Sequence, residues 1–114
     1  MEQVLARLRA AAEATRLRLL AICAECELTV SEITQIIGQS QPRVSRHLKL
    51  LCEAGLLVRF REGTWVFYRT PHSGPGADLV QPVLDLLPKD DETLALDRAR
   101  LDQVKAEREK IATE

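Results

Sequence analysis

The amino-acid sequence predicts a mainly α-helical fold that carries one β-hairpin, and three observations support this class. Alanine, leucine and charged residues, which favour helices, dominate both ends of the chain. A Thr-Val-Ser-Glu phrase in the middle is typical of a helix N-terminus. Two β-prone runs that flank an X-Gly dipeptide predict a hairpin. With 114 residues, the chain can build one hydrophobic core but not two.

The first part of the chain has a helical pattern throughout. Residues 2–25 predict one long helix or two helices, and we favour two with a break near residues 12–14. Thr29 and Glu32 form a capping box, in which each side chain can bond the backbone amide of the other residue. The short helix that starts there should end at Gly38, because glycine readily adopts the left-handed conformation of a helix C-terminus.

A second helix follows the turn after Gly38. Ser40 can cap it, Pro42 is tolerated in its first turn, and Gly55 should end it. Its inner face consists of aliphatic residues at i, i+4 and i+7, namely Val44, Leu48 and Leu51. Two helices joined by a tight turn that contains glycine predict a helix-turn-helix.

The hairpin and two further helices complete the predicted fold. The hairpin strands cover residues 57–61 and 64–69, and Glu62-Gly63 forms the turn. A helix over residues 77–87 and a last helix over residues 92–112 follow. In the last helix, opposite charges at i and i+3 predict supporting ion pairs: Asp97/Arg100, Asp102/Lys105 and Glu107/Lys110. Asp97 and Arg108 interrupt its apolar seam.

Charge is distributed unevenly along the chain, although the net charge is only -1. Residues 40–70 contain six Lys or Arg against two Glu, a balance of +4, whereas residues 85–114 contain nine acids and six bases, a balance of -3. The placement of charge determines whether a phosphate backbone is attracted. No apolar run approaches the ~18 residues of a membrane helix, and the N-terminus lacks a secretory signal. We therefore expect a cytoplasmic protein with no membrane partner.

The polar face of the second helix of the helix-turn-helix indicates double-stranded DNA as a partner. In this motif the N-terminal residues of that helix enter the major groove, and a basic hairpin beside it can act as a wing on the backbone or minor groove. The expected DNA contacts are Ser40, Gln41, Arg43, Ser45, Arg46, His47, Lys49, Arg59, Arg61 and Thr64. A solvated helix face and a charged hairpin edge are the alternatives. Trp65, Phe67 and Tyr68 are expected in the core or an interface, since duplex readers need no exposed rings.

Several phrases closely resemble the ArsR/SmtB family. They are ATRLRLL at residues 14–20, LTVSEI at 28–33, SQPRVSRHLKLL at 40–51, EAGLL at 53–57 and REG at 61–63. The resemblance covers about residues 8–87 and implies a winged helix-turn-helix repressor of bacterial type. It also implies a homodimer that reads a palindrome through its helix-turn-helix, with the first and last helices at the subunit interface. An effector, which the sequence does not identify, would release the DNA.

A dimer is expected from the residues as well. Apolar side chains without an obvious partner in so small a domain are Leu5, Leu8, Val83, Leu84 and Leu87. We therefore assign residues 1–88 to DNA binding and dimerisation. Residues 89–114 would extend the dimer contact or link to a further domain.

The resemblance also implies where metals would bind in this family. The metal-binding cysteines of relatives correspond to Thr29 and Ser31 here, and the helix after the wing contains no His, so neither metal site is present. Cys23 and Cys26 form a C-x2-C pair that would share one helix face and could bind a soft metal or oxidise, although a tetrahedral site needs more ligands. The simpler expectation is that these two and Cys52 are structural thiols, with no metal and no cofactor.

Within the family, the phrase at residues 39–45, Cys52 and the charged last helix are similar to a subgroup whose regulator domain precedes an S-adenosylmethionine-dependent methyltransferase. The chain has no glycine-rich cofactor loop after a strand, so we do not expect an enzyme. The alternatives to a self-contained repressor are the DNA-binding part of such a fusion, or a repressor that responds to metal or redox state through cysteines. A protein-binding adaptor of the same fold would leave the arginine-rich helix unexplained.

Overall fold

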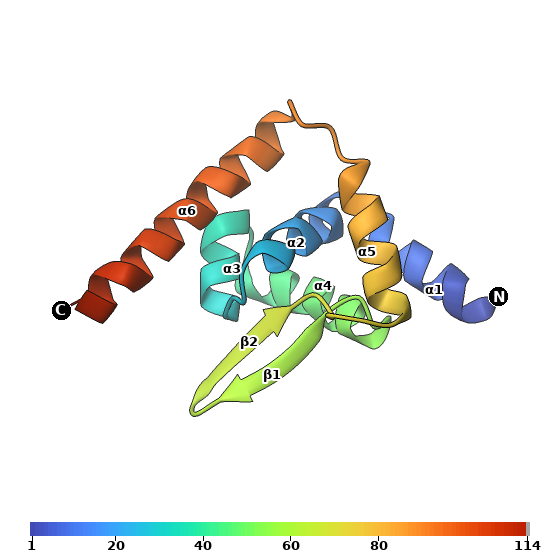
Figure 1. The fold of residues 1–114 in the computed structure, drawn as a ribbon, viewed down its shortest axis with the longest axis horizontal. Coiled ribbons are helices and arrows are strands. Elements are labelled where there is room, and N and C mark those ends of the chain that lie inside the picture. The colour runs from blue at the N-terminus through green and yellow to red at the C-terminus, as the bar shows by residue number, and fades with distance from the viewer. Residues whose placement is uncertain (114) are drawn as a thin grey trace.

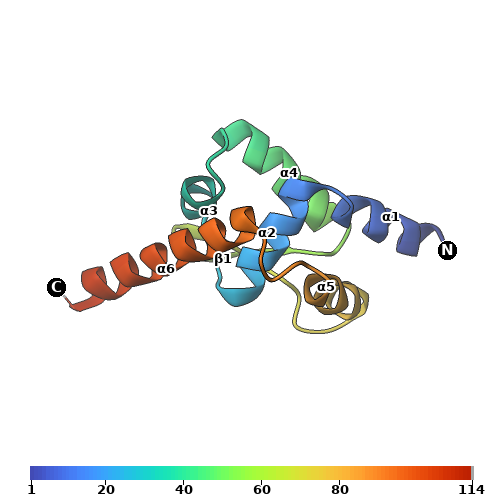
Figure 2. The same ribbon diagram turned by 90° about the horizontal axis from the view of Figure 1, so that it is seen from above.

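The computed structural model describes residues 1–113 as helices arranged around one core, with a hairpin that projects from it (Figure 1). In chain order the elements are α1 (Glu2–Ala11), α2 (Ala14–Glu25), α3 (Val30–Ile37), α4 (Gln41–Glu53), β1 (Val58–Glu62), β2 (Trp65–Arg69), α5 (Pro75–Asp85) and α6 (Glu92–Thr113). The predicted class, mainly helical with one antiparallel hairpin, is confirmed. Helices α1 and α6 lie at opposite ends of the molecule in both views (Figures 1 and 2).

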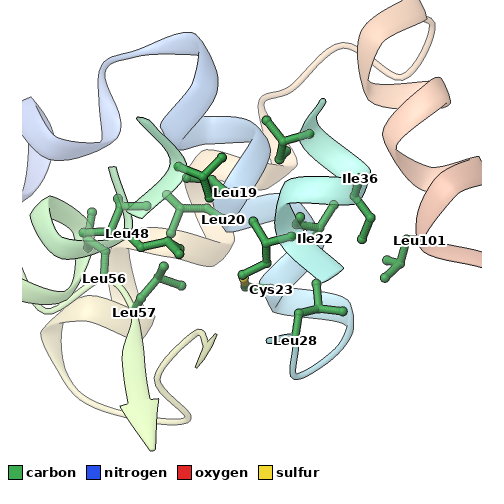
Figure 3. Packing of buried hydrophobic residues seen from close by; sticks show 14 of the residues in the cluster. Leu19, Leu20, Ile22, Cys23, Leu28, Ile36, Leu48, Leu56, Leu57 and Leu101 are labelled. Atoms are coloured by element: carbon green, nitrogen blue, oxygen red, sulfur yellow. The ribbon is translucent and has the colours of Figure 1, made fainter. Parts of the chain in front are cut away.

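Aliphatic side chains of α2, α3 and α4 form the centre of the core, since aromatic residues make up only 4% of the chain. Leu19 and Leu20 of α2, Ile36 of α3 and Leu48 of α4 are completely buried in one cluster (Figure 3). Leu56, which follows α4, joins them and carries the core to the base of the hairpin. The core therefore holds the helix-turn-helix and the hairpin in a fixed relation.

The break between α1 and α2 falls where the sequence placed it. Ala12 ends α1, and the Glu13 carboxylate caps α2 by accepting a hydrogen bond of 2.9 Å from the Arg16 amide. An acceptor at this position satisfies one of the free amides of a helix N-terminus. Two separate helices, rather than one long helix, follow from this cap.

The hairpin turn lies one residue later than the sequence predicted. Glu62 pairs with Trp65, so Gly63 and Thr64 form the two-residue turn. Gly63 takes a φ of 60°, as the first central residue of a type II′ turn requires. Strand β2 is also tied to the α2–α3 connection, because Tyr68 and Leu28 exchange two backbone hydrogen bonds of 2.8 and 3.1 Å.

Helix α5 begins at Pro75, two residues earlier than predicted, and ends at Asp85. Proline is well suited to a first helical position, where its missing amide costs nothing. The next residue, Gly76, packs directly on the backbone that follows α4. A Cβ atom on Gly76 would lie 2.0 Å from the Gly55 carbonyl oxygen, so only glycine fits there. Across residues 1–113, no helix is long and apolar enough to cross a membrane.

Helix α6 packs on α2 and α3 through its first half. Leu101 and Val104 are buried in the common core. Asp97 is only 2% exposed, and its carboxylate accepts two hydrogen bonds of 2.8 Å from the Arg18 guanidinium. Arg100 instead donates to the Ile36 carbonyl over 3.1 Å. The predicted ion pair between Asp97 and Arg100 is therefore wrong, because both side chains face α2 and α3 rather than each other.

The second half of α6 is held by Arg108. Its guanidinium binds both carboxylate oxygens of Glu32 and donates to the Glu27 carbonyl over 2.8 Å. At the other end of α3, Arg18 donates to the Ile37 carbonyl over 3.0 Å. The two residues that interrupt the apolar seam of α6 are thus its polar anchors, since Asp97 binds Arg18 of α2 and Arg108 binds Glu32 of α3.

Candidate nucleic-acid interface

The turn between α3 and α4 has the predicted geometry. The capping box is complete, with the Glu32 amide donating to the Thr29 hydroxyl and the Thr29 amide donating to the Glu32 carboxylate. Gly38 adopts the left-handed conformation, with φ 74°, and ends α3. Ser40 occupies the cap position of α4, but its hydroxyl makes no capping hydrogen bond and the residue is exposed. The turn therefore presents Ser40 beside the first residues of α4.

Helix α4 has one buried and one exposed face. The three residues predicted for the inner face, Val44, Leu48 and Leu51, are all completely buried. Four polar residues of the predicted DNA-contact set are exposed on the other side: Gln41, Arg43, Arg46 and Lys49. Ser45 is half-buried and accepts a hydrogen bond of 2.8 Å from the Gln41 side chain. The core thus fixes α4 while its polar face stays accessible.

The cations of this face differ in how far they are engaged. Arg43 donates from Nε to the Gln39 side chain over 2.9 Å, which leaves its terminal amino groups without a partner in residues 1–113. Lys49 lies 3.9 Å from Glu53 in an exposed pair, which contributes little stability. The Arg46 side chain makes no hydrogen bond or ion pair with any residue that the structure describes. These side chains can therefore donate to phosphates and base edges without breaking a strong contact.

Arg59, Arg61 and Thr64 are exposed on the hairpin, as predicted for a wing. Arg59 and Arg61 alternate with Phe60 along β1, so they lie on the opposite face of the strand from that ring. The Phe60 and Phe67 rings stack with their centroids 5.7 Å apart, and this stack stiffens the hairpin.

The wing aromatics are only partly where the sequence placed them. Phe67 and Tyr68 are half-buried, and Tyr68 packs against the core. Trp65 is 64% exposed at the tip of the hairpin, so it does not lie in the core, and of the two expected places only an interface stays a prediction. Glu62 and Trp65 form the last pair of the ladder before the turn, so Trp65 lies at the end of the hairpin that is farthest from Val58 and Arg69.

His47 was expected to face DNA, and the structure contradicts this. The residue is only 4% exposed on the inner side of α4, where Nδ1 lies 3.2 Å from the Arg16 guanidinium and 3.8 Å from the Glu13 carboxylate. Burial lowers the pKa of His47, and the positive charges of Arg16, Arg46 and Arg43 lower it further against the opposing effect of Glu13. A neutral, covered imidazole braces α4 against the start of α2 and cannot donate to DNA.

Sequence reasoning missed two residues behind the exposed face. Thr15, which is 5% exposed, accepts a hydrogen bond of 3.0 Å from the Gln39 side chain, and Gln39 in turn binds Arg43. In the sequence, Gln39 stands in the turn after Gly38 and Thr15 lies inside a helical stretch, and neither position by itself indicates a role. Their partners are 24 and four residues away in the chain, so only the position of Gln39 one helical turn before Arg43 could have indicated the second contact.

The cysteines do not form the pair that a C-x2-C spacing on a helix would give. Cys23 is 2% exposed inside the core, and burial raises the pKa of its thiol far above the ordinary value. Cys26 lies beyond the last residue of α2 in extended conformation, with its Sγ 3.3 Å from Arg108 Nη1. Burial also raises the pKa of the half-buried Cys52. Within residues 1–113, no three His, Cys, Asp or Glu side chains come together as a metal site.

Comparisons with known proteins agree on one family. Residues 13–58 match the model described as bacterial regulatory protein, arsR family. The arsenic resistance transcriptional regulator ArsR1 of Pseudomonas putida is 51% identical over 59 residues, which cover 51% of this chain and 46% of that protein. The chain thus spans about half the length of this curated relative.

Two solved structures are similar over most of the chain. The transcriptional repressor BigR from Xylella fastidiosa is 30% identical with a TM-score of 0.67, over 75% of this chain and 84% of that one. A homodimeric winged helix-turn-helix DNA-binding domain from Mycobacterium bovis is 29% identical with a TM-score of 0.63, over 75% and 74% of the two chains.

Proposed function

The chain belongs to the ArsR family of bacterial regulatory proteins, and from this premise we propose that it is a sequence-specific, DNA-binding transcriptional repressor. The observation that carries the proposal is the exposed polar face of α4. Its guanidinium and amide groups are held outward by a helix whose other face is completely buried. Relatives named as regulators and repressors support the same function.

In this proposal the first turns of α4 enter the major groove. Gln41 and Arg43 stand at the start of the helix, where the motif contacts base edges, and Arg46 follows one turn later. Arg can donate two hydrogen bonds to guanine, and Gln can do so to adenine. On the wing, Arg59 and Arg61 would follow the phosphate backbone or the neighbouring minor groove, where narrow grooves attract Arg.

We further propose that the repressor is a homodimer whose subunits meet through α1. This helix leaves Val4, Leu5 and Leu8 between 38% and 48% exposed, and Leu86 after α5 is 82% exposed. The M. bovis relative, which is described as homodimeric, supports this assembly. A two-fold axis would place the two copies of α4 about 34–36 Å apart and would require an inverted-repeat operator.

The dimer has a direct test in sedimentation. Leu5→Asp and Leu8→Asp place a charge on the exposed side of α1, so they should produce a monomer without loss of helix content. Leu84→Asp is less informative, because Leu84 also packs against the core of its own subunit. A wild-type chain that stays monomeric at micromolar concentration would exclude the homodimer.

A narrower proposal is that the chain is the DNA-binding part of a regulator that is fused to a methyltransferase. The phrase at residues 39–45 and the charged α6 are similar to regulators that precede a methyltransferase. A methyltransferase sequence after Glu114 in the same reading frame would support this fusion, and a stop codon there would contradict it.

For release from DNA we propose an effector that does not use Cys23 and Cys26 together, since one thiol is buried in the core and the other lies outside the helix.

The main proposal is tested by binding to duplexes selected from a randomised library. We expect one inverted-repeat sequence to be enriched, and its affinity to fall steeply with salt. Each phosphate that the protein neutralises contributes about -0.9 to the log–log slope for B-DNA. Binding that does not depend on salt, or no binding to any duplex, would contradict the function.

A further inference from the structure

A continuous chain of hydrogen bonds links Arg43 to the buried start of α2. Arg43 Nε donates to Gln39 Oε1 over 2.9 Å, and Gln39 Nε2 donates to the Thr15 hydroxyl over 3.0 Å. Thr15 is 5% exposed, Gln39 is half-buried and Arg43 is exposed. The chain thus runs from the core outward to the face that we assign to DNA.

The chemistry of the three groups fixes the orientation of the Gln39 amide. A guanidinium can only donate, so the amide oxygen must face Arg43. The amide nitrogen then faces Thr15, whose hydroxyl oxygen can accept. A flipped amide would bring two donors together at Arg43. Gln39 is therefore held at both ends, and Arg43 is held by a partner that cannot turn away.

The contact at Nε leaves the recognition end of Arg43 free. Of the five N–H groups of a guanidinium, one is on Nε and four are on the two terminal nitrogens. The two terminal nitrogens can donate together to O6 and N7 of guanine in the major groove. A bond at Nε fixes the plane of the guanidinium without using either terminal nitrogen.

We propose that Gln39, seated on Thr15, is a positioning residue that orients Arg43 for bidentate recognition of one guanine. This inference rests on the proposed DNA-binding function and deepens it. An Arg side chain that is free in solution must lose rotamer freedom when it binds, and that loss opposes recognition. Orientation before binding removes part of that loss, and it does so only for the base pair that Arg43 reads.

The first test measures discrimination at each base pair separately. The probe is the duplex that the wild-type protein selects from a randomised library, with every base pair substituted symmetrically in turn. Gln39→Met keeps the length of the side chain and removes both hydrogen bonds. We expect about a tenfold loss of discrimination at one G·C pair, with the affinity for a scrambled duplex unchanged. Gln103→Met, at an exposed position of α6, is the matched control and should change nothing.

Coupling to Arg43 separates positioning from a direct contact. Arg43→Ala should abolish discrimination at the same G·C pair, and Gln39→Met should then have no further effect in that background. Thr15→Val should reproduce part of the Gln39→Met effect, whereas Thr15→Ser, which keeps the hydroxyl, should restore discrimination. The thermal midpoint of each variant shows whether the α2 substitution has disturbed folding.

Three results would overturn the inference while leaving the proposed function intact. Gln39→Met could leave discrimination unchanged, could weaken binding to all duplexes equally, or could act additively with Arg43→Ala. If the wild-type protein selects no duplex at all, the DNA-binding function fails, and the role of Gln39 fails with it.

Discussion

Two regions of the molecule are rich in arginine, and they use it in opposite ways. On α6 and the helix that it covers, Arg18, Arg100 and Arg108 all bind carboxylates or backbone carbonyls of the same chain. On α4 and the wing, the side chains of Arg46 and Arg61 make no hydrogen bond or ion pair with residues 1–113. Residues 40–70 and residues 85–114 each contain six Lys or Arg, so the number of cations does not separate the two regions. The structural arginines therefore differ from those proposed to contact DNA in having their terminal nitrogens engaged by partners elsewhere in the chain.

The largest effect should come from breaking the buried pair of the first region. The Arg18 side chain is only 16% exposed, and Asp97→Ala removes the carboxylate that its guanidinium binds. We expect the free energy of unfolding to fall by about 3 kcal/mol in urea titrations. Asp102→Ala, an exposed acid on the same helix, should stay within about 0.5 kcal/mol. Equal effects of the two substitutions would contradict a structural role for the pair.

The second region should show the reverse pattern. Arg46→Ala removes an exposed guanidinium, so the urea midpoint should stay unchanged while the affinity for the selected duplex falls by about 1–3 kcal/mol if a base is contacted. Fluorescence anisotropy with specific and scrambled duplexes measures both the affinity and the lost discrimination. A lower urea midpoint with an unchanged affinity for the selected duplex would show that Arg46 has a structural role.

Arg108→Ala tests the comparison through pH. Burial alone would raise the pKa of Glu32, but hydrogen bonds from Arg108 and from the Thr29 amide hold it below 4.5. A lowered pKa means that the pair stabilises the fold above pH 4.5 and that this contribution is lost as the pH falls through the folded-state pKa. At pH 7 the substitution should cost about 1 kcal/mol, since the pair is partly exposed. The difference from wild type should shrink as the pH falls from 4.5 through the lowered pKa of Glu32, and a difference that does not change with pH would show that Glu32 is not the partner that matters.

The smallest effect is expected on the wing. Arg61→Ala should weaken binding to specific and scrambled duplexes by the same factor and reduce the magnitude of the salt slope by about one. Folding should not change, because the side chain is exposed. A loss confined to one base pair would instead mean that Arg61 reads sequence in the groove.

The sequence was sufficient for the parts of the fold that depend on near neighbours. The capping box at Thr29 and the aliphatic stripe of α4 are local patterns, and both are present as expected. His47 could also have been assigned correctly, since it follows Val44 by three residues and precedes Leu51 by four, which puts it on the same inner stripe. The position of His47 on the helix, rather than the chemistry of its imidazole, decides where the side chain lies.

The long-range contacts could not be predicted from pattern. Asp97 and Arg100 have the spacing of a helical ion pair, and nothing local indicates that Asp97 instead meets Arg18, 79 residues earlier. The link from Thr15 to Gln39 spans 24 residues across two helices in the same way. Such pairs depend on how the helices pack, and the local sequence pattern does not identify the individual partners.

Helix α6 contacts both ends of α3, with Arg108 at Glu32 and Arg100 at the Ile36 carbonyl. This arrangement has a consequence for local opening. The backbone amides of α3 and α6 should exchange with solvent deuterium as one cooperative unit. The reason is that the contacts at the two ends of α3 are made by α6, so they break together when α6 detaches. Replacing Asp97 should therefore speed hydrogen exchange in α3 and in α6 by the same factor. Helix α6 would in this way control how often the helix-turn-helix of α3 and α4 opens.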